Sequence, residues 1–227
     1  MSTNDLQKWF ASYKSGPGVH KWLSYLDLYH RYFDKYRHQD KVVFMEVGVQ
    51  SGGSIEMWRS YFGEDRLDYY GIDLDSDALK FQKNGVTILI GDQGDPAFWD
   101  SIRQVVPPID IFLDDGGHYM NQQIVTFEKM FWHVKNGGTF VCEDLHTSYM
   151  HRYIAGVGKE TMIERCKLIV DQINARWSQD EKLKEDDYTR NIAGIHFYDS
   201  MVFIDKGPTE PMIDGKRGDQ WIPYKFY

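Results

Sequence analysis

Apolar residues form short continuous runs at several places along the chain. The first such run, VVFMEVGV at residues 42–49, ends in small residues. A run of this kind is typical of a strand that is buried on both faces of a parallel sheet. Four later segments are also predicted to be strands, and they span residues 67–75, 86–92, 109–115 and 139–145.

Apolar residues also recur at the spacing of an amphipathic helix. This pattern covers residues 20–37 before the first strand and residues 159–177 after the fifth. Asp95 and Pro96 are the expected N-cap and first residue of another helix, and residues 136–138 are expected to end a helix. The helices expected between the strands span residues 54–62, 95–105 and 121–134, and the charged segment 178–191 is expected to be a solvated loop or a helix extension.

The alternation of five strands with helices predicts a doubly wound α/β domain with a mostly parallel, Rossmann-like sheet. Residues 192–207 add two strands that are closely joined near Asp199 and Ser200, which predicts seven strands and an antiparallel closing strand. We therefore expect a single domain over residues 1–227. A helical extension, the core and a tail are expected to follow one another as residues 1–41, 42–207 and 208–227.

The composition limits the classes of partner. Of the 227 residues, 42% are hydrophobic and 26% are charged, which is usual for a globular protein. The formal net charge of -8 argues against nucleic acid and anionic membrane surfaces as partners, because both attract clustered Lys and Arg. Neither a signal peptide nor a membrane-spanning run is expected, which predicts a cytoplasmic protein. Cys142 and Cys166 lie in apolar sequence and are expected to be buried, reduced thiols.

Polar side chains follow the first three expected strands, at the carboxyl ends where parallel sheets bind ligands. Glu46 precedes Gly48, so a carboxylate suited to a positively charged ligand lies beside a residue that permits close backbone approach. Asp73 ends the second strand and could accept both hydroxyl hydrogens of a ribose. Asp92 and Gln93 follow the third strand; Asp92 could accept from an adenine amine, or it could simply form a loop turn.

Taken in this order, the strand-end groups of residues 42–145 resemble those of class I S-adenosylmethionine-dependent methyltransferases. The resemblance implies that the methionine part, the ribose and the adenine of the cofactor bind at the ends of the first, second and third strands respectively. The expected cofactor-binding residues are Glu46, Gly48, Asp73, Asp92, Gln93 and Asp114.

Carboxylates gather at the ends of the fourth and fifth strands, in the segments LDDGGH and CEDLH. The two strands are expected to be neighbours, so Asp115, Glu143 and Asp144 could meet. Their combined negative charge is costly without a cation, and all-oxygen ligation favours Mg²⁺, with Mn²⁺ or Ca²⁺ next. Successive strand residues point to opposite faces, so Glu143 and Asp144 can share an ion only if the chain leaves extended geometry between them.

A histidine stands close to this carboxylate cluster. His118 follows Asp115 by three positions, and a neutral imidazole there could take the proton of an alcohol whose pKa a cation has lowered. The alcohol oxygen would then attack the sulfonium methyl group. A helix cap or a metal ligand are the alternative roles for His118. His146 is the second candidate for the base, and His133 is expected to be structural.

The motifs DDGGH and EDLHTSY narrow the resemblance to the metal-dependent sugar O-methyltransferases of macrolide biosynthesis, as does the segment GPGVHKW before the core. That family implies Asp115, Glu143 and Asp144 as metal ligands and His118 as the base. Catechol O-methyltransferases are disfavoured, because their lysine is replaced by His118 and their Asp-Asn pair by Glu-Asp. The chain is shorter than the macrolide enzymes.

The expected activity is therefore methyl transfer from S-adenosylmethionine, with Mg²⁺ or Mn²⁺, to a hydroxyl of a small molecule such as a sugar or glycoside. Two other classes are kept open. One is a module that binds the cofactor without catalysis, and the other is a protein like those associated with cephalosporin hydroxylases, although the chain has no obvious iron triad of two histidines and a carboxylate. The acceptor and any homo-oligomeric state stay open.

Overall fold

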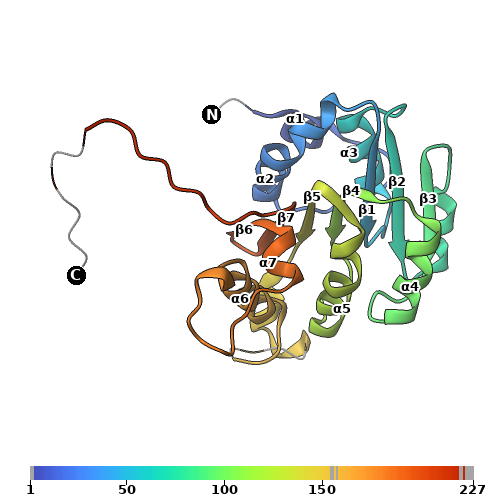
Figure 1. Cartoon of the computed structure of the whole chain (residues 1–227). Coiled ribbons are helices and arrows are strands. Elements are labelled where there is room, and N and C mark those ends of the chain that lie inside the picture. The colour runs from blue at the N-terminus through green and yellow to red at the C-terminus, as the bar shows by residue number, and fades with distance from the viewer. Residues whose placement is uncertain (1–2, 154–155, 157, 220–221, 223–227) are drawn as a thin grey trace.

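A single sheet organises the molecule (Figure 1). The structure is a computed structural model and describes residues 3–153, 156, 158–219 and 222. Seven strands in the described residues form the sheet in the order β3-β2-β1-β4-β5-β7-β6. Their bounds are β1 Val42–Val47, β2 Leu67–Asp73, β3 Val86–Ile90, β4 Ile109–Asp114, β5 Val134–Cys142, β6 Ile192–Tyr198 and β7 Met201–Lys206.

The first five strands run parallel to one another, and only β7 runs against its neighbours. This arrangement confirms the predicted doubly wound sheet with an antiparallel closing strand. Strand order reverses between β1 and β4, whose carboxyl ends lie next to each other. In such sheets the loops at the reversal form a ligand crevice, so the sheet itself places a site above β1 and β4.

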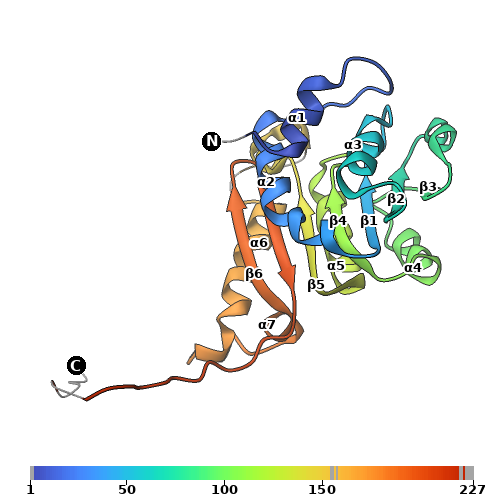
Figure 2. The same ribbon diagram turned by 90° about the horizontal axis from the view of Figure 1, so that it is seen from above.

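Helices cover both faces of the sheet (Figure 2). Side chains that alternate along each strand pack into two separate apolar clusters, as the pleat of a buried strand requires. One cluster includes Phe44 and Leu113 and packs against α1, α2 and α3, whereas the other includes Met45 and Phe112 and packs against α4, α5 and α6. The helices are α1 Asp5–Ser12, α2 Leu23–Phe33, α3 Gly53–Phe62, α4 Pro96–Val105, α5 Met120–Met130, α6 Met162–Ile173 and α7 Asp187–Asn191.

Several element boundaries differ from the sequence prediction. The predicted helix at residues 20–37 is shorter, because residues 20–22 are extended and the helix tightens to a 3₁₀ turn after Phe33. Residues 136–138 do not end a helix; they lie inside β5, which begins at Val134 and pairs irregularly with β4. Part of segment 178–191 forms α7, and α1 was not predicted as a separate helix.

Other local predictions are confirmed. Asp95 caps α4 through the backbone N–H of Ala97, and Pro96 follows it. Cys142 and Cys166 are free and buried. Residues 208–219 extend away from the sheet and are mostly exposed (Figure 1). In the described part of the chain, no helix is both long and apolar enough to cross a membrane.

Candidate active site

A cavity of about 600 Å³ opens at the carboxyl ends of β1, β2, β3 and β4. Its size suits a nucleoside cofactor or a drug-sized molecule. Its wall contains residues from both predicted groups, the cofactor group and the metal group. Of the residues singled out from the sequence, those that line it are Gly48, Asp73, Asp92, Gln93, Asp115, His118 and Asp144.

The loop after β1 needs glycine because it lies against the loop after β4. Gly48 has a φ of +91°, and a Cβ atom built on it would lie 2.1 Å from the carbonyl oxygen of Asp115. Its N–H also donates to the carbonyl of Ile72 at 2.8 Å. The glycine therefore lets three loops converge on one cavity, in addition to any close approach to a ligand.

Asp73 is held rigidly at the edge of the cavity. Its Oδ2 atom accepts a hydrogen bond from the backbone N–H of Gln50 at 2.8 Å, and its Oδ1 atom accepts from that of Asp75 at 2.9 Å. Each carboxylate oxygen can accept a second hydrogen bond. The carboxylate is thus fixed in place and can still accept hydrogens from a ligand that lies in the cavity.

Asp92 and Gln93 differ in their surroundings. Asp92 is exposed and accepts from the backbone N–H of Gly94 at 2.7 Å, which is the loop turn considered from the sequence. Gln93 is buried, accepts from the N–H of Gly117 at 2.7 Å and donates to the Asp114 carboxylate at 3.0 Å. Its amide group therefore supports the loop after β4, and Asp92 is the freer of the two for a ligand.

Two residues of the expected cofactor set, Glu46 and Asp114, are fully buried and do not line the cavity. The Glu46 carboxylate accepts from Tyr69 at 2.5 Å and from Ser54 at 2.7 Å. These internal partners take the place of the ligand ammonium that the sequence suggested. Burial raises the pKa of Glu46, although the Lys21 ammonium opposes the rise.

Asp114 also faces the protein interior. Its Oδ1 atom accepts from Gln93 and from the N–H of Gly116 at 3.3 Å, whereas its Oδ2 atom is buried without a hydrogen-bond partner among the described residues. Burial raises the pKa of Asp114 to about 6. The structure therefore places Asp114 beneath the cavity, as a support for the loop that carries Asp115.

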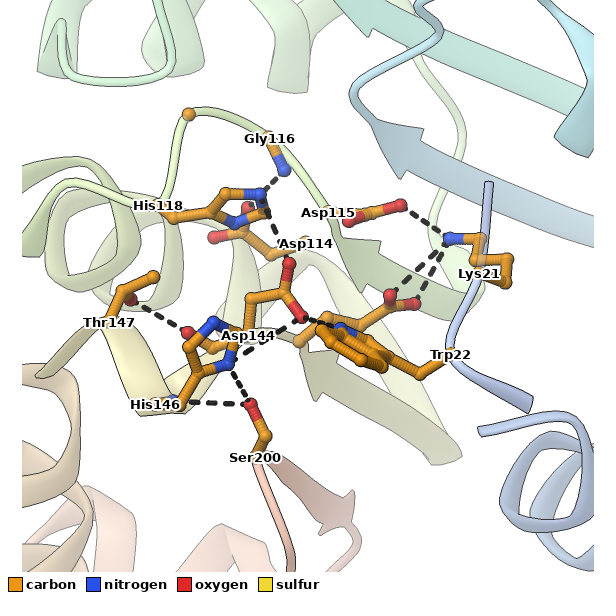
Figure 3. Close-up of polar contacts among 12 residues, drawn as sticks. Lys21, Trp22, Asp114, Asp115, Gly116, His118, Asp144, His146, Thr147 and Ser200 are labelled. Carbon is orange, nitrogen blue, oxygen red and sulfur yellow. Dashed lines mark hydrogen bonds and ion pairs between the residues drawn. The ribbon is translucent and has the colours of Figure 1, made fainter. Parts of the chain in front are cut away.

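At the other end of the cavity, Asp115, His118 and Asp144 each offer one ligand atom within 4.8 Å of the others (Figure 3). Two carboxylate oxygens and an imidazole nitrogen form a donor set that fits a divalent cation. This group differs from the predicted one, because His118 takes the place of Glu143. His118 as a metal ligand was one of the alternatives left open by the sequence.

The chain leaves extended geometry between Glu143 and Asp144, which is the condition for these two residues to share an ion. β5 ends at Cys142, and Asp144 adopts a left-handed backbone with φ 55° and ψ 37°. The bend does not bring the two carboxylates to one ligand position, because the buried Glu143 accepts from the hydroxyl of Tyr29 and pairs with Lys21. Burial, followed by the charge of Asp115, raises the pKa of Glu143 well above its usual range.

Aromatic donors fix the Asp144 carboxylate. The indole N–H of Trp22 and the hydroxyl of Tyr25 both donate to Oδ1, at 3.1 and 3.0 Å. The Oδ2 atom of Asp144 lies 3.4 Å from Nε2 of His118, so one oxygen is used in positioning and the other faces the imidazole.

The two candidate bases are in different situations. The side chain of His118 lines the cavity, although its Nδ1 atom is itself buried and has no hydrogen-bond partner among the described residues. His146 does not line the cavity, and its Nδ1 atom lies 2.5 Å from the hydroxyl of Ser200 (Figure 3). His133, as predicted, is structural and contacts the carbonyl of Val106 at 2.8 Å. The geometry favours His118 over His146 for contact with a bound molecule.

Backbone strain is concentrated at this edge of the sheet. Within the described residues, the non-glycine residues with positive φ are Gln50, His118, Asp144 and Ser200. His118 and Asp144 belong to the group that fits a cation, Gln50 donates to Asp73, and Ser200 contacts His146. Such conformations cost roughly 1–3 kcal/mol each and persist where the surrounding structure enforces them, which is common at functional sites.

The N-terminal segment contributes functional groups that the sequence reasoning missed. Lys21 extends its ammonium into the carboxylate cluster, and Trp22, Tyr25 and Tyr29 donate to Asp144 or Glu143. Burial lowers the pKa of Lys21, but Asp115, Glu143 and Glu46 outweigh it and raise that pKa well above its usual value. The available signal was the unbalanced charge of the carboxylates, which a bound metal ion or a basic side chain of the chain can offset.

No protein-family model matches the chain. It is similar to demethylmacrocin O-methyltransferase of Streptomyces fradiae, with 30% identity over 211 residues. It is also similar to mycinamicin VI 2''-O-methyltransferase of Micromonospora griseorubida, with 31% identity over 219 residues. Each alignment covers 87% of this chain and 51% of the relative, so the chain spans about half the length of these proteins.

Among solved structures, the fold matches MycE methyltransferase from the mycinamycin biosynthetic pathway, a structure in complex with Mg and SAH. The TM-score is 0.77 at 29% identity, and the match covers 98% of this chain and 57% of that one. The chain has the class I methyltransferase fold and resembles these O-methyltransferases. The likeness extends well beyond residues 42–145, the region identified from the strand-end groups, and includes most of the N-terminal extension.

Proposed function

We propose that the chain transfers a methyl group from S-adenosylmethionine to a hydroxyl of a sugar or glycosylated small molecule, with Mg²⁺ or a similar cation. One observation carries the proposal: a single cavity has the fixed Asp73 carboxylate at one end and the Asp115–His118–Asp144 group at the other. The relatives named demethylmacrocin and mycinamicin VI O-methyltransferase support the reaction type and the acceptor class.

The residues that would hold the cofactor follow the order of the strand ends. Asp73 is the proposed acceptor for the ribose hydroxyls, and Asp92, an exposed carboxylate that also lines the cavity, is the proposed acceptor for the adenine amine. Gly48 and the loop after β1 are then left for the methionine part.

Of the three side chains that could hold a cation, Asp115 and Asp144 are the proposed ligands and His118 is kept for proton transfer. Glu143 is a further carboxylate ligand if its contact with Lys21 is released. The bound cation would supply positive charge that stabilises a developing alkoxide on the acceptor. His118 is the proposed general base: its imidazole takes the hydroxyl proton, and Asp144, 3.4 Å away, stabilises the resulting positive charge. The oxygen–methyl bond forms as the carbon–sulfur bond breaks, which leaves S-adenosylhomocysteine.

The test is methyl transfer from labelled S-adenosylmethionine to a panel of glycosides with free neighbouring hydroxyls. We expect transfer that a chelator abolishes and Mg²⁺ restores. His118→Ala should reduce kcat by about 10²–10⁴-fold, whereas His146→Ala should retain most of it, because His146 contacts Ser200 outside the cavity. Full activity after exhaustive chelation, or a larger loss in His146→Ala than in His118→Ala, would contradict the assignment. Tight cofactor binding without cation binding would instead favour the non-catalytic module.

A further inference from the structure

Lys21 places a buried positive charge inside the carboxylate cluster. Its side chain is 2% exposed, and its Nζ atom lies 2.5 Å from the carboxylate of Asp115 (Figure 3). The same atom lies 3.2 Å from Glu143 and 3.5 Å from Glu46. No other Lys or Arg among the described residues forms a salt bridge with these three carboxylates. The ammonium thus supplies positive charge to this carboxylate cluster from within the chain itself.

The same carboxylates are needed by a divalent cation. Asp115 belongs to the group that fits a cation, and Glu143 belongs to the set predicted from the sequence. A cation that binds Asp115 must either displace the ammonium or lie close to its charge, and in a partly buried site both are unfavourable. Lys21 therefore opposes the binding of a divalent ion at this position.

The position of Lys21 is fixed by its neighbours. Gly18 accepts a hydrogen bond from the N–H of Gly53 at 3.0 Å, and a Cβ atom on Gly53 would lie 2.3 Å from that carbonyl oxygen. On the other side, Trp22 donates to Asp144. Residues 18–21 also line the cavity. The backbone that carries Lys21 is thereby held on both sides, which keeps the side chain within reach of the carboxylates.

We propose that Lys21 is a built-in competitor of the divalent cation: it holds Asp115 and Glu143 together in the cation-free protein and weakens cation affinity. The inference rests on the proposed function, because it uses the same cation site. Lys21 acts here as a positioning residue, and its effect is measurable without an acceptor or any turnover.

The experiment measures Mn²⁺ binding to the full chain by titration calorimetry in the absence of cofactor. Lys21→Met, which keeps the length of the side chain and removes its charge, should bind Mn²⁺ at least about tenfold more tightly than the unsubstituted chain. Lys41→Met is the matched control, because Lys41 is exposed and pairs with Asp68 away from the cavity. Its affinity should be unchanged.

Equal or weaker binding by a cooperatively folded Lys21→Met variant would overturn the proposal. If that variant does not fold, Glu46→Gln removes the third carboxylate without touching the proposed cation ligands. The double variant should then bind Mn²⁺ more tightly than Glu46→Gln alone, and equal binding would overturn the proposal. If neither the unsubstituted chain nor any variant binds Mn²⁺, the cation site of the proposed function is wrong as well. If Mn²⁺ binds but the removal of Lys21 does not tighten its binding, only the role of Lys21 is wrong.

Discussion

Asp73 has two roles: it fixes the backbone of two loops, and it faces the cavity. Its carboxylate fixes the backbone at Gln50 and Asp75 and also faces the cavity. The sequence assigned Asp73 to the ribose, and its contacts add the role of a loop cap. A binding measurement can separate them, because loss of the cap affects the stability of the fold and loss of the ligand contact affects affinity.

Asp73→Ala should weaken S-adenosylhomocysteine binding by roughly 1.5–3 kcal/mol, because hydrogen bonds from a ligand to a charged acceptor are lost. Titration calorimetry is the measurement. Asp68→Ala, an exposed carboxylate at the other end of β2, is the matched control and should bind normally. Equal affinity in Asp73→Ala and the control would reject the role of Asp73 in the ribose site.

The raised pKa of the buried Asp114 carboxyl makes the stability of the fold depend on pH. Burial raises its pKa from 3.8 to about 6, so between these values the folded state binds more protons than the unfolded state. Stability from this group is therefore highest below pH 3.8 and falls as pH rises through about 6. The shift of about 2 units corresponds to about 3 kcal/mol lost at pH 7.

Asp114→Asn keeps an oxygen for Gln93 and Gly116 and removes the buried charge. Urea unfolding in the presence of chelator should show the variant more stable than the unsubstituted chain by up to about 3 kcal/mol at pH 7. The gain should shrink toward zero near pH 4. A gain that is independent of pH would show that the ionisation of Asp114 is not its source.

At the level of the elements, the strands were predictable, whereas the contacts of the N-terminal segment with the carboxylates were not. The apolar runs that became β1 and β4 are long, continuous and bounded by polar residues, so local sequence determines them. The contact of Lys21 with Glu143 joins positions 122 residues apart, and no local pattern encodes it. The start predicted for β5 was too late for a related reason: residues 136–138 have turn composition, yet they lie in the irregular part of β5, between Val134 and Thr139, which pair with β4.

The loop after β1 lies against the loop after β4, so a methyl group added at Gly48 should destabilise the fold. Gly48→Ala should destabilise the fold by about 2–4 kcal/mol, because a strained φ is combined with a clash against the Asp115 carbonyl. Gly137→Ala is the matched control: its φ of +84° is similar, but its Cβ atom meets nothing within 4 Å. The control should lose only about 1 kcal/mol, and chemical denaturation measures both. Equal losses would show that loop contact is unimportant.

At the level of the whole molecule, the doubly wound sheet accounts for where the site lies, and the sequence predicted both. It did not predict which carboxylates would face the cavity. Glu46, Asp114 and Glu143 all follow apolar runs, as Asp73 and Asp115 do, yet the first three point into the protein. That choice depends on internal donors such as Tyr29 and Tyr69, which come from distant segments.

The central proposal is that a cation and the reactive methyl group share one cavity, beside His118. Nuclear magnetic resonance tests this directly with Mn²⁺ and S-adenosylmethionine that is isotope-labelled in its transferred methyl group. We expect strong paramagnetic broadening of the methyl signal in the complex, which Asp115→Asn and Asp144→Asn together remove while the cofactor stays bound. A bound methyl group whose signal Mn²⁺ leaves sharp, under conditions where calorimetry shows both ligands bound, would contradict the proposal.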